Sequence, residues 1–237
     1  MAGRMRGAAA CARAGRPLLV HSFAQWRAAA RDLLAHQVAP HTVLWIALRD
    51  EGAPLSRAAD PATVPAAPLR IPRTLMHLLQ AAACCRVPGR WAFLYLVLWR
   101  WQRGERAVLS LADPDGARLH GMAATVRREE LAMLAAIRFR ERRADTGPPR
   151  FVAWCEPRHA VLARLARHFA SRMGRVSFMI ATPDASVLWD GARLHSTGAL
   201  LRGPGDIDAG GDAAWPVHYR GLFHPPRLHA DLMKNLP

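Results

Sequence analysis

The sequence predicts an α+β fold, in which strands and helices combine at both ends of a helical centre. Apolar residues make up 51% of the 237-residue chain, which is enough to bury a core. Three patterns carry the prediction: an N-terminal β-α-β unit, helical periodicity in the central portion, and a C-terminal strand-helix unit followed by a small antiparallel meander. We expect residues 17–143 and 150–237 to pack together as one structural domain.

The N-terminal portion begins with the expected β-α-β unit. Residues 18–21 form a short apolar strand, and Ser22 with Gln25 supplies a capping box for a helix that ends near His36. Residues 42–48 are β-branched and apolar enough for an interior strand. Residues 1–16 are basic and lack a signal-like apolar stretch, so we expect a disordered tail. Residues 50–72 contain five prolines and predict a loop.

The central portion is predicted to be helical. Residues 73–86 and 91–103 read as two helices separated by the breaker at residues 87–89, and the second is apolar on nearly every face. A longer helix over residues 118–143 places its apolar side chains on one stripe. It ends in arginines, which suit the negative end of a helix dipole.

The C-terminal portion combines strands with one helix. Residues 151–155 and 176–182 predict strands, with a helix from Pro157 to Met173 between them. The pair Asp190-Gly191 indicates a tight hairpin and therefore the antiparallel meander. Residues 196–212 are rich in Gly, Pro and Asp and predict a loop, and residues 215–223 predict a short final helix.

The charge of the chain favours a polyanionic partner. Lysine and arginine number 33 against 18 acidic residues, a formal charge of +15. Clustered cations gain affinity for nucleic acid by releasing its condensed counterions. If the two basic helices bury their apolar stripes, their arginines share a solvent face; the alternative is a solvated, partly ion-paired face without a partner. The candidate nucleic-acid-binding residues are Arg127, Arg128, Arg138, Arg140, Arg158, Arg164, Arg167 and Arg172.

Three tryptophans are candidates for stacking on unpaired bases. They are Trp101, Trp154 and Trp189. Core packing is the favoured interpretation for each of them, because a tryptophan side chain gains most from burial.

Catalytic candidates are few. His159 follows the Glu156-Pro157 turn and could act as an acid or base with Glu156 orienting it, although a locally bonded histidine at a helix start is the favoured interpretation. Asp184 and Asp190 could form a carboxylate pair for a metal, but aspartates are common in such turns. The four cysteines include no CxxC pair and suit a reducing cytoplasm. We expect no metal site and no cofactor.

Several blocks of the chain together form a recognisable pattern, and its residues are Trp99, Arg100, Gln102, Arg103, Gly104, Trp154, Glu156, Pro157, Thr182, Pro183, Asp184, Trp189, Asp190 and Gly191. The pattern resembles that of one bacterial family assigned to DNA repair or DNA metabolism. The resemblance implies a radical-SAM partner or a UdgX-type uracil-DNA glycosylase, because members of the family occur beside the first or fused ahead of the second. Where the family has a His-Lys pair and a second histidine, this chain has Leu131-Ala132 and Ala160.

The resemblance and the charge lead to three hypotheses. The first is an accessory protein that binds single-stranded or damaged DNA and acts with a glycosylase or radical-SAM partner. The second is an enzyme acting on DNA or a modified base through His159, and the third is a scaffold for the repair partner that does not bind DNA. The chain has no iron-sulfur cysteine motif and no Walker loop. Its longest apolar run is half the length of a membrane span, so we expect a cytoplasmic protein without membrane insertion.

Overall fold

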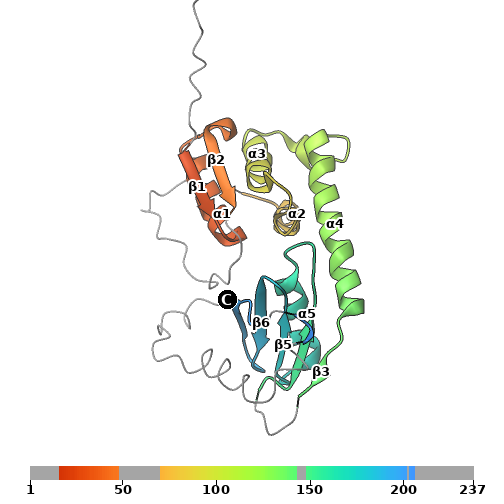
Figure 1. Cartoon of the computed structure of the whole chain (residues 1–237). Helices are drawn as coiled ribbons and strands as arrows, with labels where there is room; N and C mark the ends of the chain where they lie inside the picture. The colour runs from red at the N-terminus through yellow and green to blue at the C-terminus, as the bar shows by residue number, and fades with distance from the viewer. Residues whose placement is uncertain (1–15, 48–69, 143–147, 202, 206–237) are drawn as a thin grey trace, which may run out of the picture.

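The structure, a computed structural model, describes residues 16–47, 70–142, 148–201 and 203–205. Its α+β architecture confirms the predicted class (Figure 1). Three central helices lie between a two-stranded sheet near the N-terminus and a five-stranded sheet in the C-terminal portion. The predicted tail, most of the proline-rich loop and the final helix at residues 215–223 lie outside the described residues.

The N-terminal β-α-β unit is present. It consists of β1 (Arg16–Val20), α1 (Phe23–Ala35), a 3-10 turn η1 (Pro40–Thr42) and β2 (Val43–Ala47), and the two strands pair in parallel. The predicted capping box forms, since the Gln25 amide donates to Ser22 Oγ at 3.3 Å and the His21 amide donates to Gln25 Oε1 at 3.0 Å.

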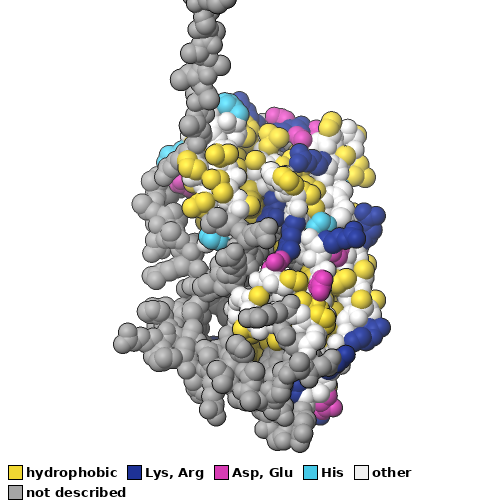
Figure 2. Space-filling model, in the orientation of Figure 1, with side chains coloured by type: hydrophobic (Ala, Val, Ile, Leu, Met, Phe, Trp, Pro, Cys, Tyr) yellow, Lys and Arg dark blue, Asp and Glu magenta, His cyan; other side chains and the backbone are white. Residues whose placement is uncertain are grey.

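The expectation that β2 is an interior strand is wrong. Among the described residues β1 is the only strand beside β2, and one face of β2 packs on the helices through Trp45, whose ring lies 5.6 Å from that of Tyr95. The other face is open, and Leu44 and Leu19 are 53% and 61% exposed. Figure 2 shows these apolar side chains gathered over β1 and β2. An unbroken apolar run does not distinguish a strand buried on both faces from one covered on a single face.

The central helices are α2 (Arg73–Ala83), α3 (Arg90–Gln102) and α4 (Pro114–Ala136), with a 3-10 turn η2 (Arg106–Leu109) before α4. α3, which the sequence indicated to be apolar on nearly every face, is the most deeply buried of these three helices, with Leu94, Tyr95 and Val97 excluded from solvent. Gly89, in the left-handed conformation at φ 69°, precedes it where the sequence indicated a break. Among the described residues, no helix combines the length and apolarity that crossing a membrane requires.

The long basic helix ends earlier than predicted. α4 stops at Ala136, Ile137 is extended, and the following residues form the short strand β3 (Arg140–Glu141). Leaving the helix buries Ile137 and places the Phe139 ring 4.9 Å from Phe169 and 5.6 Å from Phe178. This tertiary packing outweighs the helical propensity of the arginine-rich segment.

The C-terminal sheet has the order β3-β4-β5-β6-β7. β4 (Phe151–Trp154) and β5 (Phe178–Ala181) pair in parallel, with α5 (Leu162–Met173) as the crossover. β6 (Ala185–Trp189) and β7 (Leu194–Gly198) complete the predicted antiparallel meander. Two boundaries were wrong: α5 begins at Leu162 and not at Pro157, and residues 196–198 belong to β7 and not to a loop.

α4 connects the two portions of the molecule. It packs against α2 in the central portion and against α5 in the C-terminal portion. One continuous buried cluster includes Leu79 of α2, Leu94 of α3 and Leu165 of α5. The ends of α2 and α5 therefore have fixed positions relative to α4. The candidate site lies where these segments meet α4.

Candidate functional site

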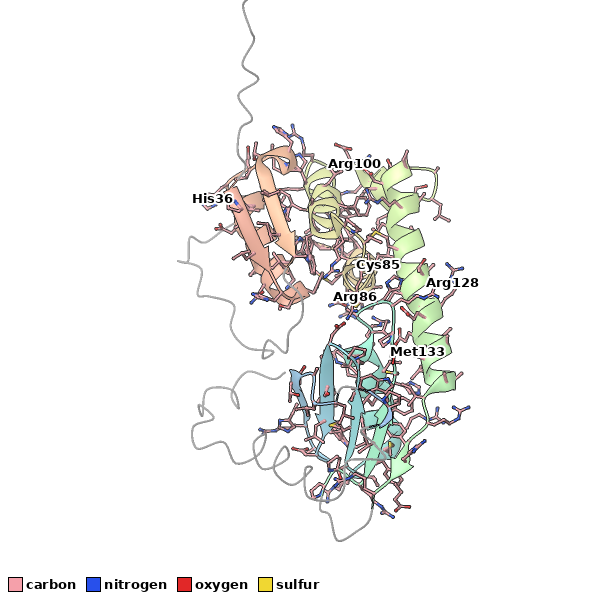
Figure 3. The ribbon with its side chains drawn as sticks, in the orientation of Figure 1. His36, Cys85, Arg86, Arg100, Arg128 and Met133 are labelled. Carbon is pink, nitrogen blue, oxygen red and sulfur yellow. The ribbon has the colours of Figure 1, made fainter. Side chains whose placement is uncertain are left out.

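Three segments that are distant in sequence meet where α2 ends. They are residues 84–86 after α2, residues 129–130 of α4, and the loop 155–161 after β4. The Ala160 amide donates to the Cys84 carbonyl at 2.9 Å, and the Arg86 amide donates to His159 Nδ1 at 3.3 Å. We call this meeting point the junction. Figure 3 shows Cys85 and Arg86 beside α4 at this level, above the C-terminal sheet.

His159 is held at the junction by two partners. Because its Nδ1 accepts the Arg86 amide, the neutral ring carries its proton on Nε2. Nε2 lies 4.0 Å from Oε2 of Glu129, and the two side chains are only 15% and 13% exposed. Glu129 Oε1 accepts the Arg158 amide, whereas Oε2 is buried without a hydrogen-bond partner among the described residues.

Glu156 does not orient His159 as the sequence suggested. Its Oε1 accepts a hydrogen bond from Trp154 Nε1 at 2.8 Å. The carboxylate that faces His159 is instead Glu129, which comes from a different helix and 30 positions earlier in the chain. No local motif connects the two residues, so the sequence carried no signal for this pair.

A cavity of about 300 Å³ opens beside the junction. It lies at the carboxyl ends of the parallel strands β4 and β5, where the loops after the strands supply its walls. Such an edge is the usual place for ligands in parallel sheets. Its lining residues are Arg86, Glu156, Pro157, Arg158, Thr182, Pro183 and Asp184.

One wall of the cavity is the turn from β5 to β6. Thr182 is buried, and its hydroxyl donates to the Ala185 carbonyl at 2.8 Å and accepts the Ala185 amide at 3.1 Å. These bonds fix the turn and leave the Asp184 carboxylate free to bind Arg86 at 2.7 Å. Thr182 therefore shapes the wall, and Asp184 belongs to an ion pair across it.

Asp184 and Asp190 do not form a carboxylate pair. They lie just beyond opposite ends of β6, six residue steps or about 20 Å apart at the usual rise of a strand. Among the residues described, no group of three His, Cys, Asp or Glu side chains is arranged to hold a metal ion.

Asp190 organises the hairpin between β6 and β7. Its Oδ1 accepts the amides of Ala192 and Arg193, both at 2.7 Å, and its Oδ2 lies 2.9 Å from His195 Nε2. Partial burial acts to raise the pKa of the Asp190 carboxyl, but these hydrogen bonds outweigh it and the pKa is lowered. His195 was not predicted as a site residue, because the Asp190-Gly191 pattern indicates a turn but not which side chain binds Asp190.

The block at residues 99–105 is structural. Arg100 on α3 binds three carboxylates at 2.7 Å each, those of Glu105, Asp113 and Asp115, and so joins the end of α3 to the start of α4. Gln102 Nε2 donates to the Leu34 carbonyl at 3.4 Å, and Gly104 adopts φ 88°. Arg103 stacks over the Trp99 ring at 5.4 Å.

The candidate arginines fall into two groups. Arg164 is not a free cation, since it binds Glu130 of α4 at 2.7 Å and fastens α5 to α4. Arg140 is exposed and lies in the strand β3, not on a helix. The remaining candidates are exposed, and within the described chain no carboxylate lies within ion-pair distance of them: Arg127, Arg128, Arg138, Arg158, Arg167 and Arg172.

The three candidate tryptophans are all engaged within the protein. Trp101 is 9% exposed and its Nε1 donates to the Arg70 carbonyl at 3.2 Å. Trp189 is half-buried and donates to the Gly174 carbonyl at 2.7 Å. Trp154, also half-buried, donates to Glu156.

The described cysteines are thiols within or beside the core. Burial raises the pKa of Cys84, Cys85 and Cys155, in the last case to about 11. A raised pKa keeps the thiol protonated at neutral pH, and the thiolate is the reactive form. Burial and a protonated thiol both favour a packing role for these residues.

The site thus belongs to an α+β protein with a charged cavity at a sheet edge and an arginine-lined surface beside it. The model of DUF4130, a domain of unknown function, matches residues 88–237, and the chain belongs to this family. The matched region contains α4, α5, the whole five-stranded sheet and six of the seven cavity-lining residues. Comparison with curated proteins and with solved structures found no match.

Proposed function

We propose that the protein is an accessory factor of DNA repair or DNA metabolism that binds single-stranded or damaged DNA. The observation that carries the proposal is the set of exposed arginines on and beside α4 and α5 that no described carboxylate neutralises. Figure 2 shows basic side chains along the α4 edge of the molecule. The partner, a uracil-DNA glycosylase or a radical-SAM protein, is suggested by the family resemblance alone.

The way in which α4 and α5 are joined supports a single binding surface. The Arg164–Glu130 ion pair at 2.7 Å joins the two helices, and it neutralises the negative charge of Glu130. Arg127 and Arg128 remain exposed on α4, and Arg167 and Arg172 on α5. Guanidinium groups at fixed positions can contact successive phosphates of one strand without reading its bases.

Salt-dependent binding tests the proposal. Binding of a fluorescent single-stranded oligonucleotide, followed by anisotropy, should weaken steeply as salt rises. Replacing Arg127 and Arg128, or Arg167 and Arg172, by alanine should reduce the salt slope by about two, roughly one for each lost phosphate contact.

A matched control removes the same charge elsewhere. Arg27 and Arg31 are exposed on α1, which Figure 1 places on the opposite side of the central helices from α4. The R27A/R31A variant should keep nearly the full slope. Equal losses in all three double variants would show that only net charge matters, and binding without any salt dependence would overturn the proposal.

An enzyme acting on DNA is the second candidate, and the His159–Glu129 arrangement favours it. A largely buried histidine facing a carboxylate is an arrangement used for acid-base catalysis. Uracil-containing and undamaged oligonucleotides incubated with stoichiometric protein provide the test. Product that forms with the wild type but not with H159A would establish the enzyme; intact substrate supports the accessory role.

A further inference from the structure

The cavity at the ends of β4 and β5 contains opposite charges that are not paired with each other. Arg158 and Glu156 both line it and lie two positions apart in the chain. Glu156 uses one oxygen to accept Trp154 Nε1, and neither its second oxygen nor the Arg158 guanidinium has a hydrogen-bond or ion-pair partner in the part of the chain described. The cavity therefore offers one free cation and one free acceptor.

The backbone around these two groups is fixed. Glu129 accepts the Arg158 amide, and the Cys155 amide donates to the Ala181 carbonyl at 3.0 Å, which extends the β4–β5 pairing to the cavity edge. Pro157 restricts the backbone between Arg158 and Glu156. Glu156 and Arg158 are both exposed and are not paired with each other among the described residues, so each can contact a ligand in the cavity.

The remaining lining combines apolar and paired polar residues. Pro157 and Pro183 contribute apolar ring surface, and Arg86 and Asp184 form an ion pair at 2.7 Å. A volume of about 300 Å³ is at the lower end of the range for ligand pockets. It matches a single nucleotide and not a longer stretch of strand.

We propose that this cavity binds one unpaired nucleotide of the bound strand, with its phosphate on Arg158 and the amino edge of its base on Glu156. The proposal rests on the proposed function and adds base selectivity to it. A carboxylate only accepts hydrogen bonds, so it favours a base with an exocyclic amino group. Cytosine presents its N4 amino group where thymine presents the O4 carbonyl, so the two pyrimidines should be distinguished.

The test compares two homopolymers of equal length and charge. Wild-type protein should bind a dC dodecamer roughly tenfold more tightly than a dT dodecamer at neutral pH, which corresponds to one base-specific contact. In E156Q, the amide oxygen can still accept from Trp154 Nε1 while the NH₂ group can donate to thymine. The dC preference should therefore fall to about twofold or less. R158A should weaken binding of both oligonucleotides equally.

Each outcome separates this proposal from the broader one. If E156Q keeps the wild-type ratio, or if the wild type shows no preference, the nucleotide cavity is overturned and salt-dependent DNA binding stands. If neither oligonucleotide binds at low salt, both proposals fail. The R27A/R31A control should retain the full dC preference, since its substitutions lie on α1. Loss of the preference in that variant would also count against the cavity.

Discussion

Glu129 of α4 faces His159 of the loop after β4, with Oε2 and Nε2 4.0 Å apart. The same carboxylate accepts the amide of Arg158 through Oε1. One side chain thus faces the histidine and holds the backbone of the arginine that borders the cavity. Through Arg86, which donates its amide to His159, the arrangement also includes the end of α2.

Substitution of Glu129 should separate its two roles. Glu129→Ala removes the acceptor of the Arg158 amide and should lower the free energy of unfolding by about 1.5–3 kcal/mol, the usual value for a hydrogen bond to a charged group. Glu129→Gln keeps an acceptor and removes a buried charge whose second oxygen has no described partner. It should therefore cost less stability than Glu129→Ala, because the Arg158 amide keeps its acceptor. Urea unfolding of the two variants provides the measurement, and equal losses would contradict this account.

The carboxylates around Arg100 predict a component of acid sensitivity. Hydrogen bonds from Arg100 and from the Gly116 amide lower the pKa of Asp113 from 3.8 to about 2. A carboxyl with a lower pKa in the folded state stabilises the protein while it is ionised. Its contribution is complete above about pH 4 and is lost as the pH falls towards 2.

Asp113→Asn tests this component. Asparagine can still cap α4, but it does not titrate. The variant should be less stable than the wild type at pH 7, and the difference should shrink between pH 4 and pH 2.5. Urea midpoints across that range would show it. Arg100→Gln should shift the pKa of Asp113 back towards its usual value, and parallel pH profiles for wild type and D113N would exclude the assignment.

Local signals predicted much of the fold. The Ser22–Gln25 capping box, the break at Gly89 and the Asp190-Gly191 turn each depend on neighbouring residues, and each occurs where the sequence indicated it. The errors arose from tertiary packing. Packing of Ile137 and Phe139 ends α4 early, and one face of β2 is exposed in a sheet that has two strands within the described residues.

The candidate site was predictable only in part. Glu156 and Asp184 line the cavity, and His159 lies at the junction beside it. Glu156 binds the nearby Trp154, whereas Asp184 binds Arg86 and His159 faces Glu129. The long-range contacts could not be inferred from the sequence, since Arg86 and His159, for example, are 73 positions apart. Contacts between residues so distant in the sequence depend on how the helices pack, and the periodicity of apolar residues does not specify that packing.

The hairpin between β6 and β7 requires glycine at position 191. Gly191 adopts φ 100°, and a Cβ added there would lie 2.5 Å from the Arg175 carbonyl oxygen. Gly191→Ala should cost about 1–3 kcal/mol of unfolding free energy from the backbone alone, with the clash adding to it. Gly121→Ala is the control, because this helical glycine has open space around its Cβ position. That variant should gain up to about 1 kcal/mol, and thermal unfolding of both would test the contrast.

We expect Trp189 to stabilise the C-terminal sheet and not to stack on a base. It packs against the main buried cluster, and its Nε1 donates to the Gly174 carbonyl after α5 at 2.7 Å. Trp189→Ala should cost about 3 kcal/mol or more, because a large side chain and a hydrogen bond are lost together. Trp189→Phe keeps most of the packing and loses the bond, so it should cost about 1 kcal/mol. Denaturation beside a DNA titration distinguishes the alternatives: a base-stacking role would leave stability nearly unchanged and weaken DNA binding by about 1–3 kcal/mol.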